Sequence, residues 1–382
     1  MSLFAMYQNR LGQGQTISRE QAIEDLSGNL CRCTGYRPIL DAAQAMGALK
    51  SSPIDEVRLL QQLELVKQGI REPEADISYV SPQNLHDLLG HRARHPKAQL
   101  VAGCTDVGLW VNKLHMNFDQ VLDVSQVREL RRIQRYAHHI AIGAAVSLHD
   151  AFAALVQDRP QLRAFALRFA GLPVRNSGTL GGNVANGSPI GDSMPLLIAL
   201  GANVVLMRMD KGIIRPREMP LEKLYTGYRQ NVMASDEVLA WIKVPSPSPL
   251  AAPLELMRIY KVSKRFEDDI SAVCLGLQLH VDKGVVTSAS IGIGGVAATP
   301  VRAIKTEAAL TGQPWTIGTV KLAMATLRQE FQPISDMRAS SHYRTQVLGN
   351  LLQRFWLESQ GKALASLESF DSNDPQAQEV SL

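Results

Sequence analysis

The stretch NSGTLGGNVANGSPIGDSMP, residues 176–195, constrains the fold more than any other part of this sequence. Glycine, serine and asparagine dominate it, and it leads into an apolar segment that could be a helix. A backbone without bulky side chains can approach a ligand closely and point several N–H groups at one anion. The stretch therefore suits a pyrophosphate, and the alternative is a flexible glycine-rich surface loop.

A second turn of small residues, LVAGCTDVGL at residues 100–109, follows a predicted strand earlier in the same region. It offers the same opportunity for a close approach of backbone to ligand. Two such turns in one domain favour a nucleotide site more than either turn does by itself.

Charge and hydropathy argue against two classes of partner. Lysine plus arginine number 40 and aspartate plus glutamate number 36, a balance that does not favour nucleic-acid binding. The longest apolar run, MPLLIALGANVVLM, has 14 residues, whereas a membrane-spanning helix needs ~20. The first residues lack the pattern of a secretory signal peptide. Of four cysteines, Cys104 and Cys274 are expected singly in apolar strands, so we expect a reducing compartment and a cytoplasmic location.

The ends of the chain differ from its middle. Residues 1–50 have helical periodicity, with Ser18 and Gln21 predicted to form a capping box at the start of one helix. Residues 51–75 are charged and bounded by prolines, so we expect a linker that is partly helical. Residues 363–382 are polar and aperiodic, as a loose tail is.

The middle of the chain predicts two domains. Residues 76–248 alternate strand patterns with helical patterns, which indicates an α+β domain. Residues 254–362 begin with three strand patterns and end with helical ones. This order predicts a smaller α+β domain whose sheet is covered by helices on one face.

One motif, GIGGVA at residues 292–297, fits the dinucleotide-binding fingerprint only in part. It follows a strand pattern and leads into a predicted helix with Thr299 as cap and Pro300 at its first position. The fingerprint also needs a second strand with an acidic residue ~20 positions later, where this chain has a turn and another helical pattern. We interpret the motif as a turn from strand to helix.

The stretch NLCRCTGYRPIL contains Cys31 and Cys33, separated by one residue. A disulfide between them is disfavoured, because so short a spacer rarely allows the required separation and orientation of the two alpha carbons. A metal site remains possible, but no histidine lies nearby and the other ligands must come from elsewhere.

Several of these stretches resemble segments of one family, the molybdenum hydroxylases. CRCTGYRPI is similar to the segment of their iron–sulfur domain in which two cysteines bind a 2Fe-2S cluster. LVAGCTDVG and FAGLPVRNSGTLGGNVANGSPIGD resemble the flavin-binding segments of their middle domain, which has the p-cresol methylhydroxylase type of FAD-binding fold. YKVSKRFEDDISAV and GGVAATPVRA resemble segments of the small domain that follows. The resemblance covers about residues 1–362.

The resemblance implies a fold and a set of site residues. The fold would be a helical remnant of a 2Fe-2S domain, an FAD-binding domain and a small α+β domain. Cys31 and Cys33 would be ligands of the cluster. The implied cofactor-binding residues are Leu100, Val101, Ala102, Gly103, Cys104, Thr105, Asp106, Val107, Phe169, Thr179, Leu180, Gly181, Gly182, Asn183, Asp192, Tyr228, Leu239 and Lys261.

Four of these residues have implied roles. Gly181 and Gly182 would bring backbone donors to the FAD pyrophosphate. Lys261 would favour negative charge on the reduced flavin. Tyr228 would lie near the nicotinamide of NAD, although it is equally a candidate for packing between domains. Cys104 stands where this family more often has glycine or asparagine, and we assign it no redox role.

In this family a second cysteine pair, C-x-x-C, and a ferredoxin-like domain with another cluster lie upstream of the segment similar to MSLFAMY. The present sequence starts after both. Because four thiolates normally hold such a cluster, we expect Cys31 and Cys33 to form half a site, with no stable cluster in this chain.

Within the family, the most similar type is the small subunit of bacterial xanthine dehydrogenase. The resemblance implies a flavin subunit that passes electrons from a molybdenum partner subunit and iron–sulfur clusters through FAD to NAD. One alternative is the flavin subunit of another molybdenum hydroxylase, acting on an aldehyde, carbon monoxide or a nitrogen heterocycle. The other is an FAD-binding module without turnover of its own.

Overall fold

The computed structural model describes residues 1–30, 35–49, 54–69, 78–247, 253–266 and 268–362. Cys31 and Cys33, the two ends of the predicted linker and the predicted tail lie outside the described residues. Among the helices that are described, none combines the length and the hydropathy of a membrane span.

Short helices form the N-terminal part of the chain. They bury a small core that contains Met6, Ala22 and Ala43. The predicted capping box is confirmed: Ser18 Oγ accepts from the backbone N–H of Gln21 at 3.2 Å, and Gln21 Oε1 accepts from that of Ser18 at 2.9 Å. A further helix confirms that the segment after this part is partly helical. The elements are α1 (Ser2–Asn9), η1 (Leu11–Gln13), α2 (Arg19–Leu26), α3 (Arg37–Ala45), η2 (Met46–Ala48) and α4 (Glu56–Gly69).

The next part begins with a parallel three-stranded sheet in the order β1-β3-β2. Its strands alternate with two helices, as the sequence predicts. Leu88 and Leu89 of the first helix are fully buried against this sheet and the neighbouring one. The elements are β1 (Tyr79–Val80), α5 (Leu85–Arg94), β2 (Gln99–Val101), α6 (Val107–Leu114) and β3 (Val121–Asp123).

An antiparallel five-stranded sheet follows, in the order β4-β5-β10-β6-β7. Helices α7, α8, α10 and α11 contribute buried apolar side chains to a core shared with this sheet. The strands are β4 (Ile133–Arg135), β5 (His139–Gly143), β6 (Asn203–Asp210), β7 (Ile213–Pro220) and β10 (Val238–Pro245), with η3 (Glu129–Arg131) before them. The helices are α7 (Leu148–Asp158), η4 (Pro160–Leu162), α8 (Arg163–Arg168), α9 (Leu172–Ser177), α10 (Leu180–Asn186) and α11 (Ser193–Ala199). After β7 come η5 (Leu221–Lys223) and the hairpin β8 (Tyr225–Gly227) and β9 (Gln230–Asn231).

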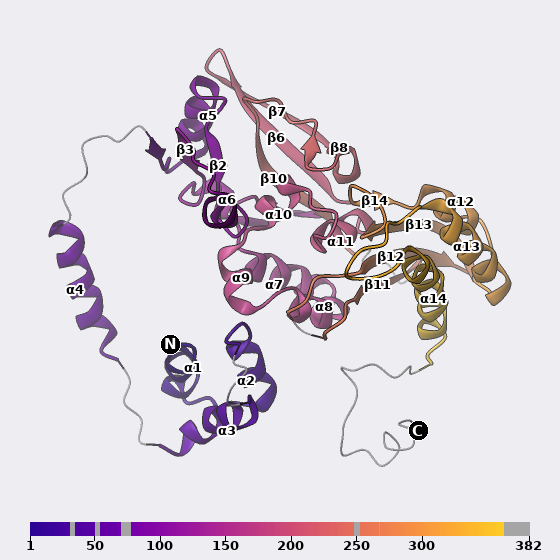
Figure 1. Cartoon of the computed structure of the whole chain (residues 1–382), viewed down its shortest axis with the longest axis horizontal. Coiled ribbons are helices and arrows are strands. Elements are labelled where there is room, and N and C mark those ends of the chain that lie inside the picture. The colour runs from indigo at the N-terminus through magenta and orange to yellow at the C-terminus, as the bar shows by residue number, and fades with distance from the viewer. Residues whose placement is uncertain (31–34, 50–53, 70–77, 248–252, 267, 363–382) are drawn as a thin grey trace.

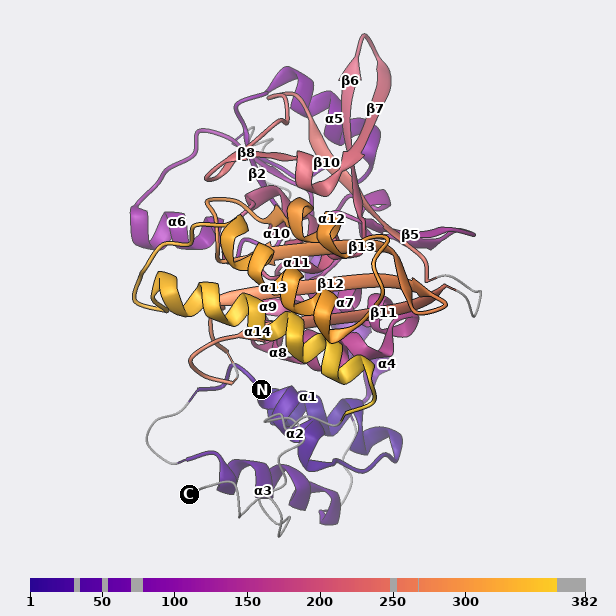
Figure 2. The ribbon, with the colours of Figure 1, turned by 90° about the vertical axis from the view of Figure 1, so that its right-hand side faces the viewer.

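The C-terminal part is an antiparallel sheet in the order β11-β12-β13-β14, with helices packed on it (Figure 2). Its core is separate from that of the five-stranded sheet. The elements are β11 (Leu254–Val262), β12 (Val273–Asp282), β13 (Val285–Gly294), β14 (Val301–Arg302), α12 (Ile304–Leu310), α13 (Ile317–Glu330) and α14 (Ser341–Ser359).

The prediction that this sheet is covered on one face is wrong. Helix α11 packs on its other face, between the two larger sheets (Figure 1). Glycines permit the approach, because a Cβ atom on Gly276 or Gly292 would lie 2.7 or 2.1 Å from the carbonyl oxygen of Pro195 in α11. Distances this short never occur for real side chains, so α11 requires glycine at both positions.

The prediction for the turn after β13 also needs correction. Thr299 and Pro300 do not begin a helix, because Val301 and Arg302 first pair with β13 as the short edge strand β14. Helix α12 begins at Ile304, with Ala303 as its N-cap residue. Arg302 then forms hydrogen bonds of 2.9 and 3.0 Å with the Glu307 carboxylate, which ties the edge strand to the helix.

Candidate functional site

The two turns of small residues meet in the structure. Gly103, in the first turn, packs directly on the second: a Cβ atom there would lie 1.8 Å from the carbonyl oxygen of Ser177. Asn186, at the end of α10, donates a hydrogen bond of 2.6 Å to Asp106 Oδ2. The contact and the hydrogen bond join segments about 80 residues apart, as the prediction of one shared site requires.

Free backbone donors distinguish the first turn. Within the described residues, none of the N–H groups of residues 103–106 donates a hydrogen bond to the protein. Cys104 has a φ of +55°, in the left-handed region that glycine and asparagine adopt most readily. This conformation explains why a strand was the wrong prediction for Cys104. Although Cys104 is exposed, partial desolvation by its surroundings, followed by the nearby Asp123 carboxylate, raises the pKa of its thiol, so the group is not an activated nucleophile.

The second turn differs from the prediction in one respect. Gly181 donates its N–H to the carbonyl of Ala144 at 3.1 Å, and Gly182 donates its own to Thr179 Oγ1 at 3.0 Å, so both donors are already used. Gly181 serves close packing, because a Cβ atom there would lie 2.3 Å from that of Ala144. We therefore expect the anion to be held mainly by the first turn, with the second turn as its support.

A buried charged cluster lies where the C-terminal sheet meets α11. Lys261 Nζ donates to Asp192 Oδ2 at 2.7 Å, and the two side chains are 4% and 6% exposed. Ser271 Oγ donates to the same oxygen at 2.8 Å. An ammonium group has three donors, and within the described residues Lys261 uses one of them.

Phe169 and Leu239 lie in the core beside these turns. Phe169 follows α8 and packs on Phe152, with ring centroids 4.8 Å apart. The buried Arg175 holds the Phe169 segment by donating hydrogen bonds to the carbonyls of Leu167, at 2.9 Å, and Ala170, at 2.5 Å. Burial lowers the pKa of Arg175. Leu239 is buried in β10, at an irregularity in its pairing with β6.

Tyr228 does not belong to the charged cluster of Lys261, Asp192 and Ser271. It lies at the tip of the β8–β9 hairpin and is 60% exposed. Within the described residues its ring contact is with the Arg229 guanidinium, 5.6 Å from the ring centroid. An exposed aromatic side chain of this kind suits either a passing ligand or a contact with another chain.

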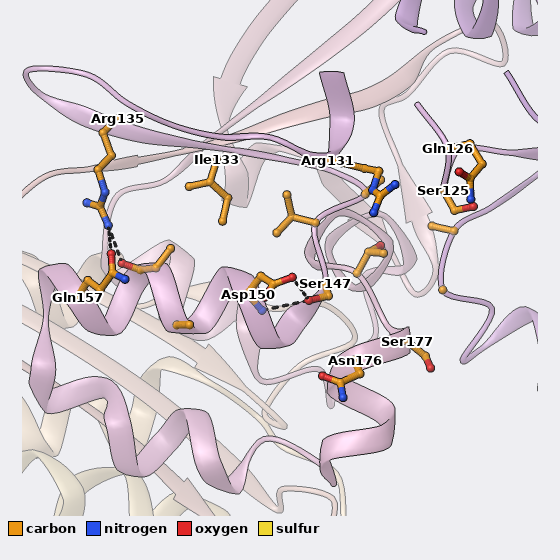
Figure 3. A pocket seen from close by; sticks show the side chains of 17 residues that line it. Ser125, Gln126, Arg131, Ile133, Arg135, Ser147, Asp150, Gln157, Asn176 and Ser177 are labelled. Atoms are coloured by element: carbon orange, nitrogen blue, oxygen red, sulfur yellow. Dashed lines mark hydrogen bonds between the residues drawn. The ribbon is translucent and has the colours of Figure 1, made fainter. Parts of the chain in front are cut away.

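A cleft of about 890 Å³ opens beside the two turns. Ala102 and Gly103 of the first turn and Thr179 of the second line it. Figure 3 shows the cleft in close-up, with Asn176 and Ser177 of the second turn labelled. Further lining residues come from the segment after β3 and from η3, β4 and the start and body of α7, where no glycine motif marks them; they include Ser125, Gln126, Arg131, Arg135, Ser147, Asp150 and Gln157. A cavity of this volume is typical of cofactor sites.

The residues present fit a dinucleotide. The first turn offers free N–H groups of the kind that bind a pyrophosphate, and Lys261 offers free ammonium donors at a buried position. The first turn thus suits a phosphate-bearing part and Lys261 a group that gains negative charge; Lys261 is not among the residues that line the cleft.

Helix α2 brings the segment before the cysteine pair against α9. The hydroxyl of Ser27 accepts a hydrogen bond of 2.8 Å from the N–H of Leu172. Gly28 adopts a φ of +84°, and a Cβ atom there would lie 3.0 Å from Pro173 Cδ. Among the described residues, no cluster of three or more His, Cys, Asp or Glu side chains forms a metal site. Cys31 and Cys33 themselves lie outside them.

Comparison with protein families agrees with this architecture. Residues 75–247 match the FAD binding domain in molybdopterin dehydrogenase. Residues 258–359 match the CO dehydrogenase flavoprotein C-terminal domain, and residues 1–44 match a 2Fe-2S binding domain. The chain therefore combines an FAD-binding domain of the type found in molybdopterin dehydrogenases with a CO dehydrogenase flavoprotein C-terminal domain, and the predicted fold class is confirmed.

Individual relatives fall into two groups. Xanthine dehydrogenase of Drosophila subobscura is 30% identical over 374 residues, which cover 82% of this chain and 27% of that protein. Xanthine dehydrogenase 2 of Arabidopsis thaliana is 29% identical over 390 residues, covering 82% of this chain and 28% of that protein. The chain thus spans less than a third of the length of these relatives.

The second group consists of solved structures. Carbon monoxide dehydrogenase from Hydrogenophaga pseudoflava matches with a TM-score of 0.66 and 26% identity, over 75% of this chain and 96% of that chain. Quinoline 2-oxidoreductase from Pseudomonas putida 86 has a TM-score of 0.65 at 23% identity, over 76% of this chain and 99% of that chain, and shares the fold.

Proposed function

We propose that this chain is the flavin subunit of a xanthine dehydrogenase, which passes electrons from a molybdenum partner subunit and iron–sulfur clusters to NAD during the oxidation of hypoxanthine or xanthine. The observation that carries the flavin part is the first turn, whose free N–H groups at residues 103–106 lie against the second turn. Similarity to xanthine dehydrogenases supports the choice of substrate.

Each group of residues has a task in this proposal. The N–H groups of residues 103–106 would hold the pyrophosphate, and Lys261 would stabilise negative charge that develops on the ring system. Arg175 keeps the Phe169 segment in place by binding its carbonyls. Bound FAD would supply the two-electron chemistry that links one-electron donors to a hydride acceptor.

The contact between α2 and α9 supports an entry route for electrons. The hydrogen bond from Leu172 to Ser27 places Ser27 and Gly28, which precede the cysteine pair in the sequence, next to α9. In the proposed function Cys31 and Cys33 supply two of the four thiolates of a 2Fe-2S cluster, so we expect this chain by itself to hold no stable cluster.

A second candidate, the flavin subunit of another molybdenum hydroxylase, is favoured by the match to carbon monoxide dehydrogenase, which covers nearly all of that chain. A third is an FAD-binding module without turnover. All three bind FAD, but only a subunit that reduces NAD reacts rapidly with NADH in the reverse direction.

The experiment is a titration of the purified chain with FAD, followed by anaerobic mixing with NADH in a stopped-flow spectrometer. We expect one FAD per chain and rapid bleaching of the flavin absorbance by NADH. A chain that binds no FAD would overturn the proposal as a whole. Bound FAD that NADH does not reduce would overturn the NAD-dependent function and favour the second or third candidate.

A further inference from the structure

Ser271 shares one oxygen atom with the buried ion pair. Its hydroxyl donates to Asp192 Oδ2 at 2.8 Å, and Lys261 Nζ donates to the same oxygen at 2.7 Å. Ser271 is 2% exposed, so water does not compete for this hydrogen bond. None of the motifs in the sequence singled Ser271 out as a site residue.

The shared oxygen also closes a loop. Lys261 lies near the end of β11 and Ser271 lies just before β12, and the N–H of Ala272 donates to the carbonyl of Val262 at 2.7 Å between them. Asp192, at the start of α11, therefore contacts both ends of the segment that joins the two strands. Loss of the Ser271 hydroxyl would therefore act on Lys261 through Asp192 Oδ2, the oxygen to which both side chains donate.

This arrangement has an electrostatic consequence. The Asp192 carboxylate opposes the positive field of Lys261, and it does so strongly because the pair is buried. A hydroxyl that donates to the carboxylate stabilises part of its negative charge and weakens its hold on the ammonium. With the Ser271 hydroxyl in place, more of the Lys261 field remains for a neighbouring anion.

We propose that Ser271 is a positioning residue which sets, through Asp192, how strongly Lys261 stabilises the reduced, anionic isoalloxazine ring relative to the oxidised one. The inference rests on the proposed function, since it requires FAD bound beside Lys261. A residue that only anchored the loop would affect folding stability but not the preference of the site for one oxidation state.

The experiment measures the dissociation constants of oxidised FAD and of dithionite-reduced FAD for the full chain. In S271A we expect the affinity for reduced FAD to fall about tenfold relative to that for oxidised FAD, which lowers the two-electron midpoint potential by about 30 mV. S271T keeps the hydroxyl, and we expect its ratio to stay within about twofold of the wild type. S263A is the matched control, because the Ser263 hydroxyl bonds the carbonyl of Arg265 in the same loop at 2.6 Å.

The outcomes separate the two proposals. An unchanged ratio in S271A with FAD still bound would overturn the role of Ser271 and leave the flavin site standing. The same shift in S263A would mean that the loop, not the charge on Asp192, controls the potential, and would also overturn it. If the wild-type chain binds neither form of FAD, the proposed function fails and the inference fails with it.

Discussion

Gly103 offers the sharpest test of the cofactor site. A methyl group at this position would lie 1.8 Å from the carbonyl oxygen of Ser177 and 2.8 Å from Gly178 Cα, both backbone atoms that cannot swing away. Real Cβ contacts essentially never fall below 3.0 Å, so in G103A the first turn must move away from the second by about an ångström. This displacement is large compared with the precision of a hydrogen bond.

The expected loss of FAD affinity follows from the backbone N–H groups of the first turn, which move with it. A hydrogen bond to a charged group contributes about 1.5–3 kcal/mol, so the loss of a single N–H contact to the pyrophosphate should weaken FAD binding about 10- to 100-fold. The measurement is FAD affinity by quenching of flavin fluorescence, with circular dichroism to confirm the fold. G108A is the matched control, because Gly108 lies five residues along, in α6, where a Cβ atom meets nothing within 4 Å. A folded G103A protein with wild-type affinity would refute the assignment of the pyrophosphate to this turn.

Three further predictions concern other parts of the chain. Tyr228→Ala should slow NADH reduction of bound FAD about fivefold, the equivalent of an aromatic contact worth ~1 kcal/mol, and unaltered stopped-flow traces would favour a packing role instead. For the Asp336 carboxylate, burial acts to raise the pKa, but hydrogen bonds from two backbone N–H groups and from Arg344 outweigh it and lower the pKa from 3.8 to about 2. The stability that this carboxylate contributes is therefore present above about pH 4 and lost as the pH falls through about 2, and D336N should abolish that part of the acid dependence in thermal unfolding. Gly28→Ala, which introduces strain at a φ of +84° and a contact with Pro173, should slow electron transfer from the cluster to the flavin in the complete protein several-fold; flavin reduction by NADH should stay unchanged.

Local signals predicted much of this fold. The capping box at Ser18 and the alternation of strands and helices follow from residue types and their spacing over a few positions, whereas the shared site of the two turns was inferred from the chemistry that their small residues have in common. Interactions that depend on distant backbone were not predictable in this way. Thr299 and Pro300 have the residue types of a helix start, but pairing with β13 takes the following two residues into an edge strand first.

The candidate site shows the same division. Glycines drew attention to Gly103 and Gly181 because a missing side chain is visible in a sequence. Arg175 was missed as a structural element, because its partners are the carbonyls of Leu167, Phe169 and Ala170 and every residue type has a carbonyl. The left-handed conformation of Cys104 was not predictable for a related reason, because a residue other than glycine gives no sign of a positive φ in the sequence.

Helix α11 explains how this chain can keep an ion pair buried at the candidate site. Buried charges are costly unless their geometry is held precisely, and Asp192 immediately precedes α11, whose residues Ser193–Ala199 are all buried. The helix packs on the core of the five-stranded sheet and, through Gly276 and Gly292, against the backbone of the C-terminal sheet. Asp192 is thus held by the packing of α11 on the five-stranded sheet. Lys261 and Ser271 flank the loop between β11 and β12 of the C-terminal sheet. The close approach that the two glycines allow is what brings the three side chains within hydrogen-bonding distance. A substitution that separates the two sheets should therefore break the ion pair between Lys261 and Asp192 before it unfolds either core.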